Sequence, residues 1–154
     1  MPFSKTQEYA LQALILLATT PELFRLNRDV AAQLDVPGPY LAKVLKRFAR
    51  LGYVESAKGR GGGYRISAIA LEAPVLAVLA AADGNDPFAG CVIGLSRCTA
   101  RTACPLHEKW APQRDRMVRM FEDETIEGLA AKARKGRTRL VRTPRAARPR
   151  SAER

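Results

Sequence analysis

The sequence of 154 residues is poor in the side chains from which most enzyme active sites are built. It contains one histidine, three cysteines and one tryptophan. General acid–base and nucleophilic catalysis need a titratable group placed beside the reacting atoms, or an activated serine or cysteine nucleophile. No such constellation stands out along the chain, and we therefore expect neither an enzyme nor a small-molecule substrate.

Long apolar runs are also missing. The longest candidates without a charge are residues 9–20 and 73–82, and both are shorter than the roughly 18 residues that a membrane-spanning helix needs. Residues 10–18 have the apolar character of a signal peptide, but Glu8 and Gln12 interrupt the pattern and no Ala-x-Ala cleavage motif follows. We expect a soluble, cytoplasmic protein without a membrane partner.

Acidic residues are scarce, because 15 Asp and Glu stand against 26 Lys and Arg, which gives a formal net charge of +11. Residues 132–154 carry a net +9 and residues 39–65 carry a net +6, so the remainder is mildly acidic. This distribution favours a polyanionic partner, nucleic acid before membrane. We expect residues 134–154 to form a disordered basic tail that either solubilises the chain or binds DNA without sequence preference.

Apolar periodicity predicts two helices near the N-terminus. Ser4 and Gln7 match a capping box at the start of a helix over residues 5–19. Asn27 is a suitable N-cap for a short helix over residues 28–34. These two helices would precede the most informative segment of the sequence.

A third helix follows a turn at residues 35–38, with Pro39 at its first position and Gly52 just past its end. Two helices joined by a four-residue turn, the second amphipathic and cationic, are typical of a helix-turn-helix, whose second helix enters the major groove of DNA. A basic helix face that is only solvated is the alternative. The apolar residues of this helix form one stripe, and its cations form another that faces away from it: Lys43, Lys46, Arg47 and Arg50.

Two short alternating segments, residues 53–57 and 64–67, flank a glycine-rich cationic stretch, which predicts a β-wing. We expect Gly62 and Gly63 to supply the positive φ angles of a tight hairpin and to allow close approach to a phosphate. The stretch is not a nucleotide phosphate loop, because it lacks the Gly-Lys-Ser/Thr ending and joins two strands. An ordinary turn is the alternative for this stretch alone, but the order of the elements indicates a winged helix.

The second half of the chain begins with an expected helix over residues 71–82, with Pro74 in its first turn. Residues 83–105 then show no periodicity, and a connection of this length suggests a functional loop. A long helix over residues 106–124 follows, and Thr125 caps a short helix that ends near residue 133. The long helix favours a dimer contact, with packing on its own subunit as the alternative.

The predicted fold class is mainly α with a small β-wing, a winged helix-turn-helix plus a long C-terminal dimerisation helix. The predicted organisation is a DNA-binding domain at residues 1–82, a cysteine loop at residues 83–105, dimerisation and terminal helices at residues 106–133, and a basic tail at residues 134–154. Arg60 at the wing tip would enter a narrow minor groove, where negative potential is enhanced. The expected DNA-binding residues are Tyr40, Lys43, Lys46, Arg47, Arg50, Lys58 and Arg60.

All three cysteines lie in the predicted loop with the spacing C-x6-C-x5-C, and His107 follows shortly after the last of them. An odd number of thiols does not suggest a disulfide framework. Three soft thiolates on one loop indicate a metal site, with zinc or an iron–sulfur cluster as the main choices. Structural zinc typically uses ligand pairs two to four residues apart, so the wider spacing suits a larger cluster. Cysteines without a ligand role, and a His107 that only begins a helix, are the alternatives.

On these residues the sequence resembles the Rrf2 family of bacterial winged-helix transcription regulators, which includes IscR-like iron–sulfur regulators and NsrR-like nitric-oxide sensors. The resemblance covers about residues 1–133. It is carried by residues 6–11 of the first helix, residues 40–45 of the recognition helix, the wing sequence at residues 59–64, and the three-cysteine loop. It implies a homodimer that crosses its long C-terminal helices, binds a pseudo-palindromic operator in double-stranded DNA and carries one iron–sulfur cluster per subunit.

By this resemblance Cys91, Cys98 and Cys104 are the thiolate ligands of the cluster. The fourth ligand is His107 in the IscR-like pattern and Glu8 of the other subunit in the NsrR-like pattern, and both residues are present. The first two cysteines are one residue further apart than in the IscR-like pattern. The resemblance therefore leaves both a [2Fe–2S] and a [4Fe–4S] cluster open.

The main hypothesis is a DNA-binding transcriptional regulator, a repressor whose operator binding is switched by an iron–sulfur cluster that senses redox state, nitric oxide or iron–sulfur status. A second hypothesis keeps the DNA binding but makes the cysteines a cluster-free thiol sensor. A third is a nucleic-acid-binding protein without sequence specificity, which would show steep salt dependence and no preferred site.

Overall fold

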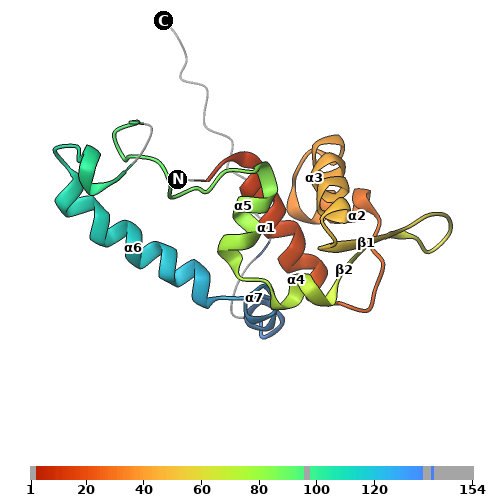
Figure 1. The fold of residues 1–154 in the computed structure, drawn as a ribbon. Helices are drawn as coiled ribbons and strands as arrows, with labels where there is room; N and C mark the ends of the chain where they lie inside the picture. The colour runs from red at the N-terminus through yellow and green to blue at the C-terminus, as the bar shows by residue number, and fades with distance from the viewer. Residues whose placement is uncertain (1–2, 96–97, 137–139, 141–154) are drawn as a thin grey trace, which may run out of the picture.

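The computed structural model describes residues 3–95, 98–136 and 140. Within them the predicted fold class is confirmed, since the chain is mainly helical with a two-stranded antiparallel wing. Most of the expected basic tail, residues 134–154, lies outside the described residues. In chain order (Figure 1) the elements are α1 (Lys5–Ala18), α2 (Asn27–Leu34), α3 (Gly38–Arg50), β1 (Val54–Ala57), β2 (Gly63–Ile66), α4 (Ala68–Glu72), α5 (Val75–Asp83), a 3₁₀ turn η1 (Ala100–Thr102), α6 (His107–Asp123) and α7 (Ile126–Arg134).

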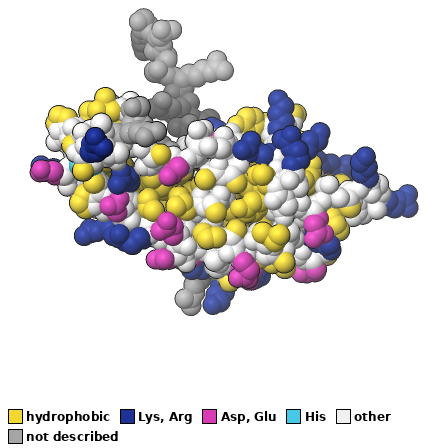
Figure 2. Space-filling view, in the orientation of Figure 1, with side chains coloured by type: hydrophobic (Ala, Val, Ile, Leu, Met, Phe, Trp, Pro, Cys, Tyr) yellow, Lys and Arg dark blue, Asp and Glu magenta, His cyan; other side chains and the backbone are white. Residues whose placement is uncertain are grey.

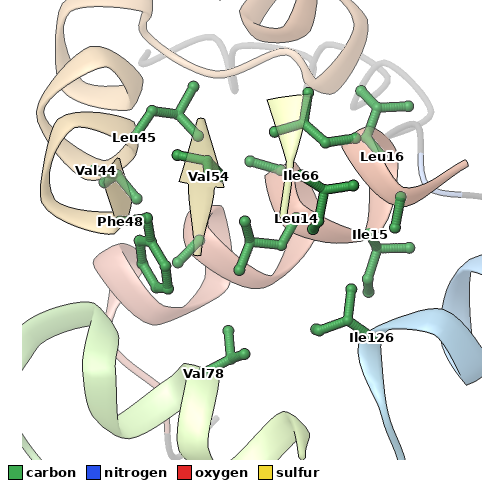
Figure 3. Close-up of a cluster of buried hydrophobic side chains, with 14 of the residues drawn as sticks. Leu14, Ile15, Leu16, Val44, Leu45, Phe48, Val54, Ile66, Val78 and Ile126 are labelled. Carbon is green, nitrogen blue, oxygen red and sulfur yellow. The ribbon is translucent and has the colours of Figure 1, made fainter. Parts of the chain in front are cut away.

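Helix α1 lies at the centre of the core and packs against α3, α5, α7 and the wing strand β2. Its apolar residues Leu14 and Leu17 are completely or almost completely buried. Figure 3 shows Leu14 facing side chains from the wing strands and α3, among them Ile66 and Phe48. Removing this apolar surface from water is the main stabilising term for the winged-helix body.

The start of α1 is the capping box that the sequence predicts. The Gln7 backbone N–H donates to Ser4 Oγ at 3.1 Å, and the Ser4 backbone N–H donates to Gln7 Oε1 at 3.0 Å. Two of the otherwise unpaired donors of the first turn are satisfied in this way.

The prediction that Asn27 caps α2 is wrong, because Asn27 is the first residue of the helix and Leu26 occupies the cap position. The Asn27 side chain instead donates from Nδ2 to the Gly38 carbonyl at 2.9 Å, which ties α2 to the start of α3. Helix α3 begins one residue earlier than expected, at Gly38. Gly52 has φ +78° just past its end, as the sequence predicts.

The wing strands pair in the register Val54↔Ile66 to Ala57↔Gly63. Positive φ angles occur at Gly59, Gly61 and Gly63, so the expectation of a positive φ at Gly62 is wrong. Gly62 is needed for space instead, because an added Cβ would lie 2.3 Å from the Ala57 carbonyl oxygen.

Gly63 is constrained both by its positive φ and by the lack of space for a Cβ. Its φ is +127°, and an added Cβ would lie 2.2 Å from the carbonyl oxygen of Arg25, which pairs with Tyr64 through two backbone hydrogen bonds of 2.9 Å. The glycine therefore allows the segment before α2 to lie against β2.

We expect Gly63→Ala to destabilise the protein by at least the roughly 1–3 kcal/mol of an unfavourable φ, measured by chemical denaturation. Gly59 also has a positive φ, +85°, but an added Cβ there would meet open space. Gly59→Ala should therefore lose only the stability that the unfavourable φ costs. Gly90→Ala has neither constraint and serves as the control. Equal stability of the Gly63 and Gly90 variants would contradict this account of the wing.

The single helix expected over residues 71–82 is wrong, because the chain forms two helices, α4 and α5. Ser67 caps α4 by accepting the Ala70 N–H at 3.2 Å. Ala73 is extended, with ψ 133°, and Pro74 occupies the cap position of α5. A residue before proline is disfavoured in the α region, and proline has no N–H for the helix ladder, so the break falls there.

Helix α6 extends away from the winged-helix body toward the cysteine loop, and its other end leads into α7 (Figure 1). It runs through Pro112 without ending, although this residue cannot donate a helical hydrogen bond. Thr125 caps α7 as predicted, by accepting the Gly128 N–H at 3.1 Å. No helix in the described ranges combines the length and apolar character needed to cross a membrane.

Candidate DNA interface and cysteine loop

Helix α3 presents two different faces. Leu41, Leu45 and Phe48 are fully buried against the core. Because the helix repeats every 3.6 residues, the lysines between them point outward. The resulting exposed cations of α3 are Lys43, Lys46 and Arg50.

These cations line a groove of about 620 Å³ between α3 and the wing, which we call the α3–wing groove. Ala49 of α3 lies on the same side as these cations, whereas Ser56, Ala57, Lys58, Tyr64 and the backbone of Gly63 line the opposite side. None of the lining residues is acidic. Glu55 belongs to the other face of β1, where it forms an ion pair with Arg65.

The wing tip extends this basic surface beyond the groove. Lys58 and Arg60 are exposed there, and the turn is built on the positive φ angles of Gly59 and Gly61. Figure 2 shows Lys and Arg side chains gathered at the end of the molecule that carries α3 and the wing. The structure therefore brings together five of the seven residues expected to bind DNA.

The other two expected DNA-binding residues contact the protein itself. Arg47 is half-buried, and its Nε donates to the Ala81 carbonyl at the end of α5 at 2.7 Å. The Tyr40 hydroxyl lies 2.5 Å from Thr6 Oγ1, and its ring packs edge-on against Tyr9 with centroids 5.5 Å apart. Both side chains fix α3 on its neighbouring helices, and Tyr40 is still 38% exposed.

The base of the cysteine loop is anchored by an aromatic cluster. Phe88 is only 4% exposed and stacks on Phe121 of α6 with centroids 5.7 Å apart. Phe3 packs edge-on against both rings. Beyond this anchor the loop exposes apolar side chains, with Val92, Ile93 and Leu95 each about half exposed.

The three thiols and the His107 imidazole form two separate pairs rather than one closed site. Cys98 Sγ lies 3.4 Å from His107 Nδ1, and the Cys91 and Cys104 side chains lie close enough to shift each other's pKa. Cys98 and Cys104 are buried, whereas Cys91 is half-buried. Among the described residues no three Cys, His, Asp or Glu side chains converge on a single metal position.

Two cysteines have shifted pKa values. Hydrogen bonding from the backbone of Ile93 lowers the pKa of Cys91. Burial raises the pKa of Cys104, and its hydrogen bond with Cys91 adds to this shift. Cys91 is therefore readier than Cys104 to become a thiolate, which is the form that binds metals and reacts with oxidants.

The donor chemistry of the loop fits an iron–sulfur cluster, because three thiols and an imidazole lie on one segment. Glu8, the other candidate ligand, lies on α1 and binds Lys5 at 2.6 Å. Nothing in the spacing pointed to Arg114 of α6, whose Nη1 donates to the Cys98 carbonyl at 2.9 Å and fixes the loop on α6.

A family model described as an iron-dependent transcriptional regulator, Rrf2, matches residues 3–132. The chain is 26% identical over 131 residues to the HTH-type transcriptional regulator NsrR of Geobacillus kaustophilus, a match that covers 84% of this chain and 89% of the relative. It is 30% identical over 101 residues to the transcriptional regulator IscR of Vibrio atlanticus, which covers 66% of this chain and 58% of the relative.

Solved structures share the fold. CymR, the global cysteine regulator of B. subtilis, superposes with a TM-score of 0.68 at 21% identity, covering 84% of this chain and 96% of that structure. IscR of T. potens superposes with a TM-score of 0.67 at 17% identity, covering 88% and 90%. Because the family model spans most of the sequence, this protein belongs to the Rrf2 family of DNA-binding transcriptional regulators and is a regulator rather than an enzyme.

Proposed function

We propose that this protein is a repressor that binds an operator as a homodimer and that an iron–sulfur cluster on its cysteine loop switches this binding. The observation that carries the proposal is the pairing of two features in one chain. A groove lined by cations and by no acid lies between α3 and the wing, and three thiols lie on the loop at the far end of α6.

The DNA contacts follow from the shape of the basic surface. With α3 in the major groove and the wing in the adjacent minor groove, the DNA strand that separates the two grooves passes over the α3–wing groove. Lys43, Lys46 and Arg50 would bind its phosphates or reach base edges from one side, and Lys58 would bind from the other. Arg60 would enter the minor groove.

Arg60→Ala is expected to weaken operator binding by about 1–3 kcal/mol, or about 5- to 150-fold in affinity. The operator is a duplex selected from a random pool by the full-length protein, and affinity is measured by fluorescence anisotropy at one salt concentration. Arg119→Ala is the control, because it also removes one exposed charge but lies on α6, away from α3 and the wing (Figure 1). An Arg60→Ala affinity equal to that of the control would contradict the role of the wing.

The dimer contact is assigned to α6, because no residue of this helix is buried within the protomer. Met120 is 52% exposed, and Leu106, which precedes the helix, is 46% exposed. Among the described residues the Trp110 indole N–H lacks a hydrogen-bond acceptor. Figure 2 shows hydrophobic side chains across the middle of the face between α6 and the body. A second copy would cover this surface.

Cys91, Cys98 and Cys104 would hold the cluster, with His107 or the partner subunit's Glu8 as the fourth ligand. Such a cluster supplies a group that oxidation, nitrosylation or iron loss changes chemically, and its type, [2Fe–2S] or [4Fe–4S], is decided by spectroscopy. The chain's own part is to keep the thiols together: Arg114 fixes Cys98 on α6, and Phe88 fixes the base of the loop.

A cluster-free thiol sensor is the second candidate function, because the Cys91 and Cys104 side chains lie close enough to shift each other's pKa. A disulfide would form if these thiols lost two electrons and two protons to peroxide, which would leave as water. CymR of Staphylococcus aureus has been crystallised in an oxidised form. Mass spectrometry after mild peroxide treatment of cluster-free protein tests this function, because the Cys91–Cys104 peptide pair would lose two hydrogens.

A further inference from the structure

The last turn of α5 is one of the places where the recognition helix α3 contacts its neighbours. Arg47 of α3 donates from Nε to the Ala81 carbonyl at 2.7 Å. Carbonyls in the last turn of a helix lack partners within the helix, and a cation there also interacts favourably with the helix dipole. The Arg47 guanidinium also lies beside Gly84, since Nη2 is 3.6 Å from the position of a Cβ on that glycine.

The same turn is bound from the other side by the start of α1. Asp83 accepts hydrogen bonds from Ser4 Oγ at 2.7 Å and from Gln7 Nε2 at 3.3 Å. Gln7 is only 2% exposed, and its Nε2 also donates to the Asn85 carbonyl at 3.0 Å. The Asn85 N–H donates to Asp83 Oδ1 at 3.1 Å, which closes the network.

We call this network the α5 junction; its members are Ser4, Gln7, Arg47, Ala81, Asp83 and Asn85. It lies at the first residues of the cysteine loop. Gly84 ends α5 in the left-handed conformation with φ +84°, and the chain then runs through the Phe88 anchor to Cys91. One side of the junction thus holds the recognition helix, and the other side leads directly to the thiols.

We propose that Arg47 is a positioning residue that couples the cysteine loop to the recognition helix and does not bind DNA. A change in the loop that moves residues 84–88 shifts the end of α5, and the Arg47–Ala81 hydrogen bond transmits this shift to α3. Helix α3 then changes its angle relative to the wing, and the α3–wing groove no longer matches the DNA strand. The inference rests on the proposed function, because it needs an operator and two states of the loop.

This arrangement separates neighbouring cations of α3 by task. Lys46 is exposed and lines the α3–wing groove, whereas Arg47 is half-buried and bonded to α5. Residues one apart on a helix do not share a face, so the two side chains point in different directions. Substituting them therefore distinguishes a DNA contact from a coupling contact.

The test measures operator affinity of the full-length protein in two states, anaerobic with the cluster and after its removal by a chelator; reduced and peroxide-treated protein are the two states if the loop is a thiol sensor. Arg47→Gln weakens the contact between the junction and α3. Asp83→Asn, on α5, weakens the contact between the junction and the start of α1. Lys46→Gln is the matched control on the neighbouring residue. Affinity is measured at several salt concentrations, because the slope of log affinity against log salt reports phosphate contacts.

We expect the two states of the wild type to differ about 5- to 150-fold in affinity. In Arg47→Gln and Asp83→Asn this ratio should fall to within about twofold of one while the salt slope stays unchanged. Lys46→Gln should keep the ratio, weaken binding equally in both states and reduce the slope by about 1. Faster amide hydrogen exchange at Asn85 in both junction variants is the readout without DNA, because its bond to Asp83 lies in the network.

An Arg47→Gln protein whose two states differ in affinity as much as those of the wild type would overturn the inference. A salt slope reduced as in Lys46→Gln would also overturn it and would return Arg47 to the DNA interface. If Arg47→Gln does not fold, Asp83→Asn alone carries the same expectation, and a wild-type ratio there overturns the inference equally. Equal affinities of the two wild-type states would overturn the proposed function together with the inference. If the operator affinities of the two states differ in the wild type and differ equally in the junction variants, only the inference is overturned and the proposed function stands.

Discussion

Cys98→Ala is expected to abolish the visible absorption of anaerobically reconstituted protein and to fix operator affinity at the value of the cluster-free state. Cys98 is buried, and its Sγ is 3.4 Å from His107 Nδ1, so its loss removes a thiolate from the centre of the proposed site. Removing one of the few ligands also leaves the remaining thiols exposed to oxidation. The measurement is an absorption spectrum with iron and sulfide determination.

The control for this variant is Val92→Ala, an apolar loop residue that is 47% exposed and is not a proposed ligand. It should keep the spectrum of the wild type. A colourless wild type that binds one equivalent of zinc would contradict the cluster, and a coloured Cys98→Ala protein would remove Cys98 from the ligand set.

The fourth ligand is decided by the same spectra. His107→Ala alters the spectrum if the imidazole is the ligand, whereas Glu8→Gln alters it if the partner subunit supplies the carboxylate. Within the protomer His107 lies beside Cys98, while Glu8 binds Lys5 on α1. The geometry of one protomer therefore favours His107, and a change caused only by Glu8→Gln would reverse this assignment.

Met120→Glu is expected to convert the dimer into monomers and to weaken operator binding by about 100-fold or more, because two linked half-site contacts gain about 10²–10⁴-fold over one. Met120 is 52% exposed on α6, so the substitution leaves the protomer intact. A carboxylate placed between two apolar helices would remain without a partner, which is costly. Sedimentation velocity gives the oligomeric state, and anisotropy gives the affinity.

Glu122→Lys is the matched control for Met120→Glu. It also changes charge on α6, but residues two apart on a helix do not face the same side. The control should remain a dimer with wild-type affinity. A Met120→Glu protein that stays dimeric would show that α6 is not the contact between subunits.

Much of the fold could be predicted because local chemistry decides it. The Ser4 and Gln7 capping box, the amphipathic pattern of α3 and the Thr125 cap all act within a few residues, and the structure shows each of them. The break between α4 and α5 is local as well. Pro74 is tolerated in the first turn of a helix, which favours one helix over residues 71–82, but proline also disfavours a helical conformation at Ala73, so two helices form.

The contacts of the candidate site that the sequence does not predict have a different origin. Sequence alone groups Arg47 with Lys46, because both are cations on α3. The carbonyl that binds Arg47 belongs to Ala81, 34 residues further along the chain. Gln7 had a local role in the cap, and its contact with Asp83 depends on how α1 and α5 pack. Such contacts follow from the tertiary fold and leave no spacing signal.

The most direct test of the central claim is operator affinity of the full-length protein with and without its cluster, measured against random duplex of the same length at one salt concentration. We expect one state to bind the operator at least about 1,000-fold tighter than random duplex, and the other state to lose about 5- to 150-fold of that affinity. Equal affinity for operator and random duplex would contradict sequence-specific operator binding and would leave only non-specific binding to phosphates. Equal affinity in both states would contradict a switch on the cysteine loop.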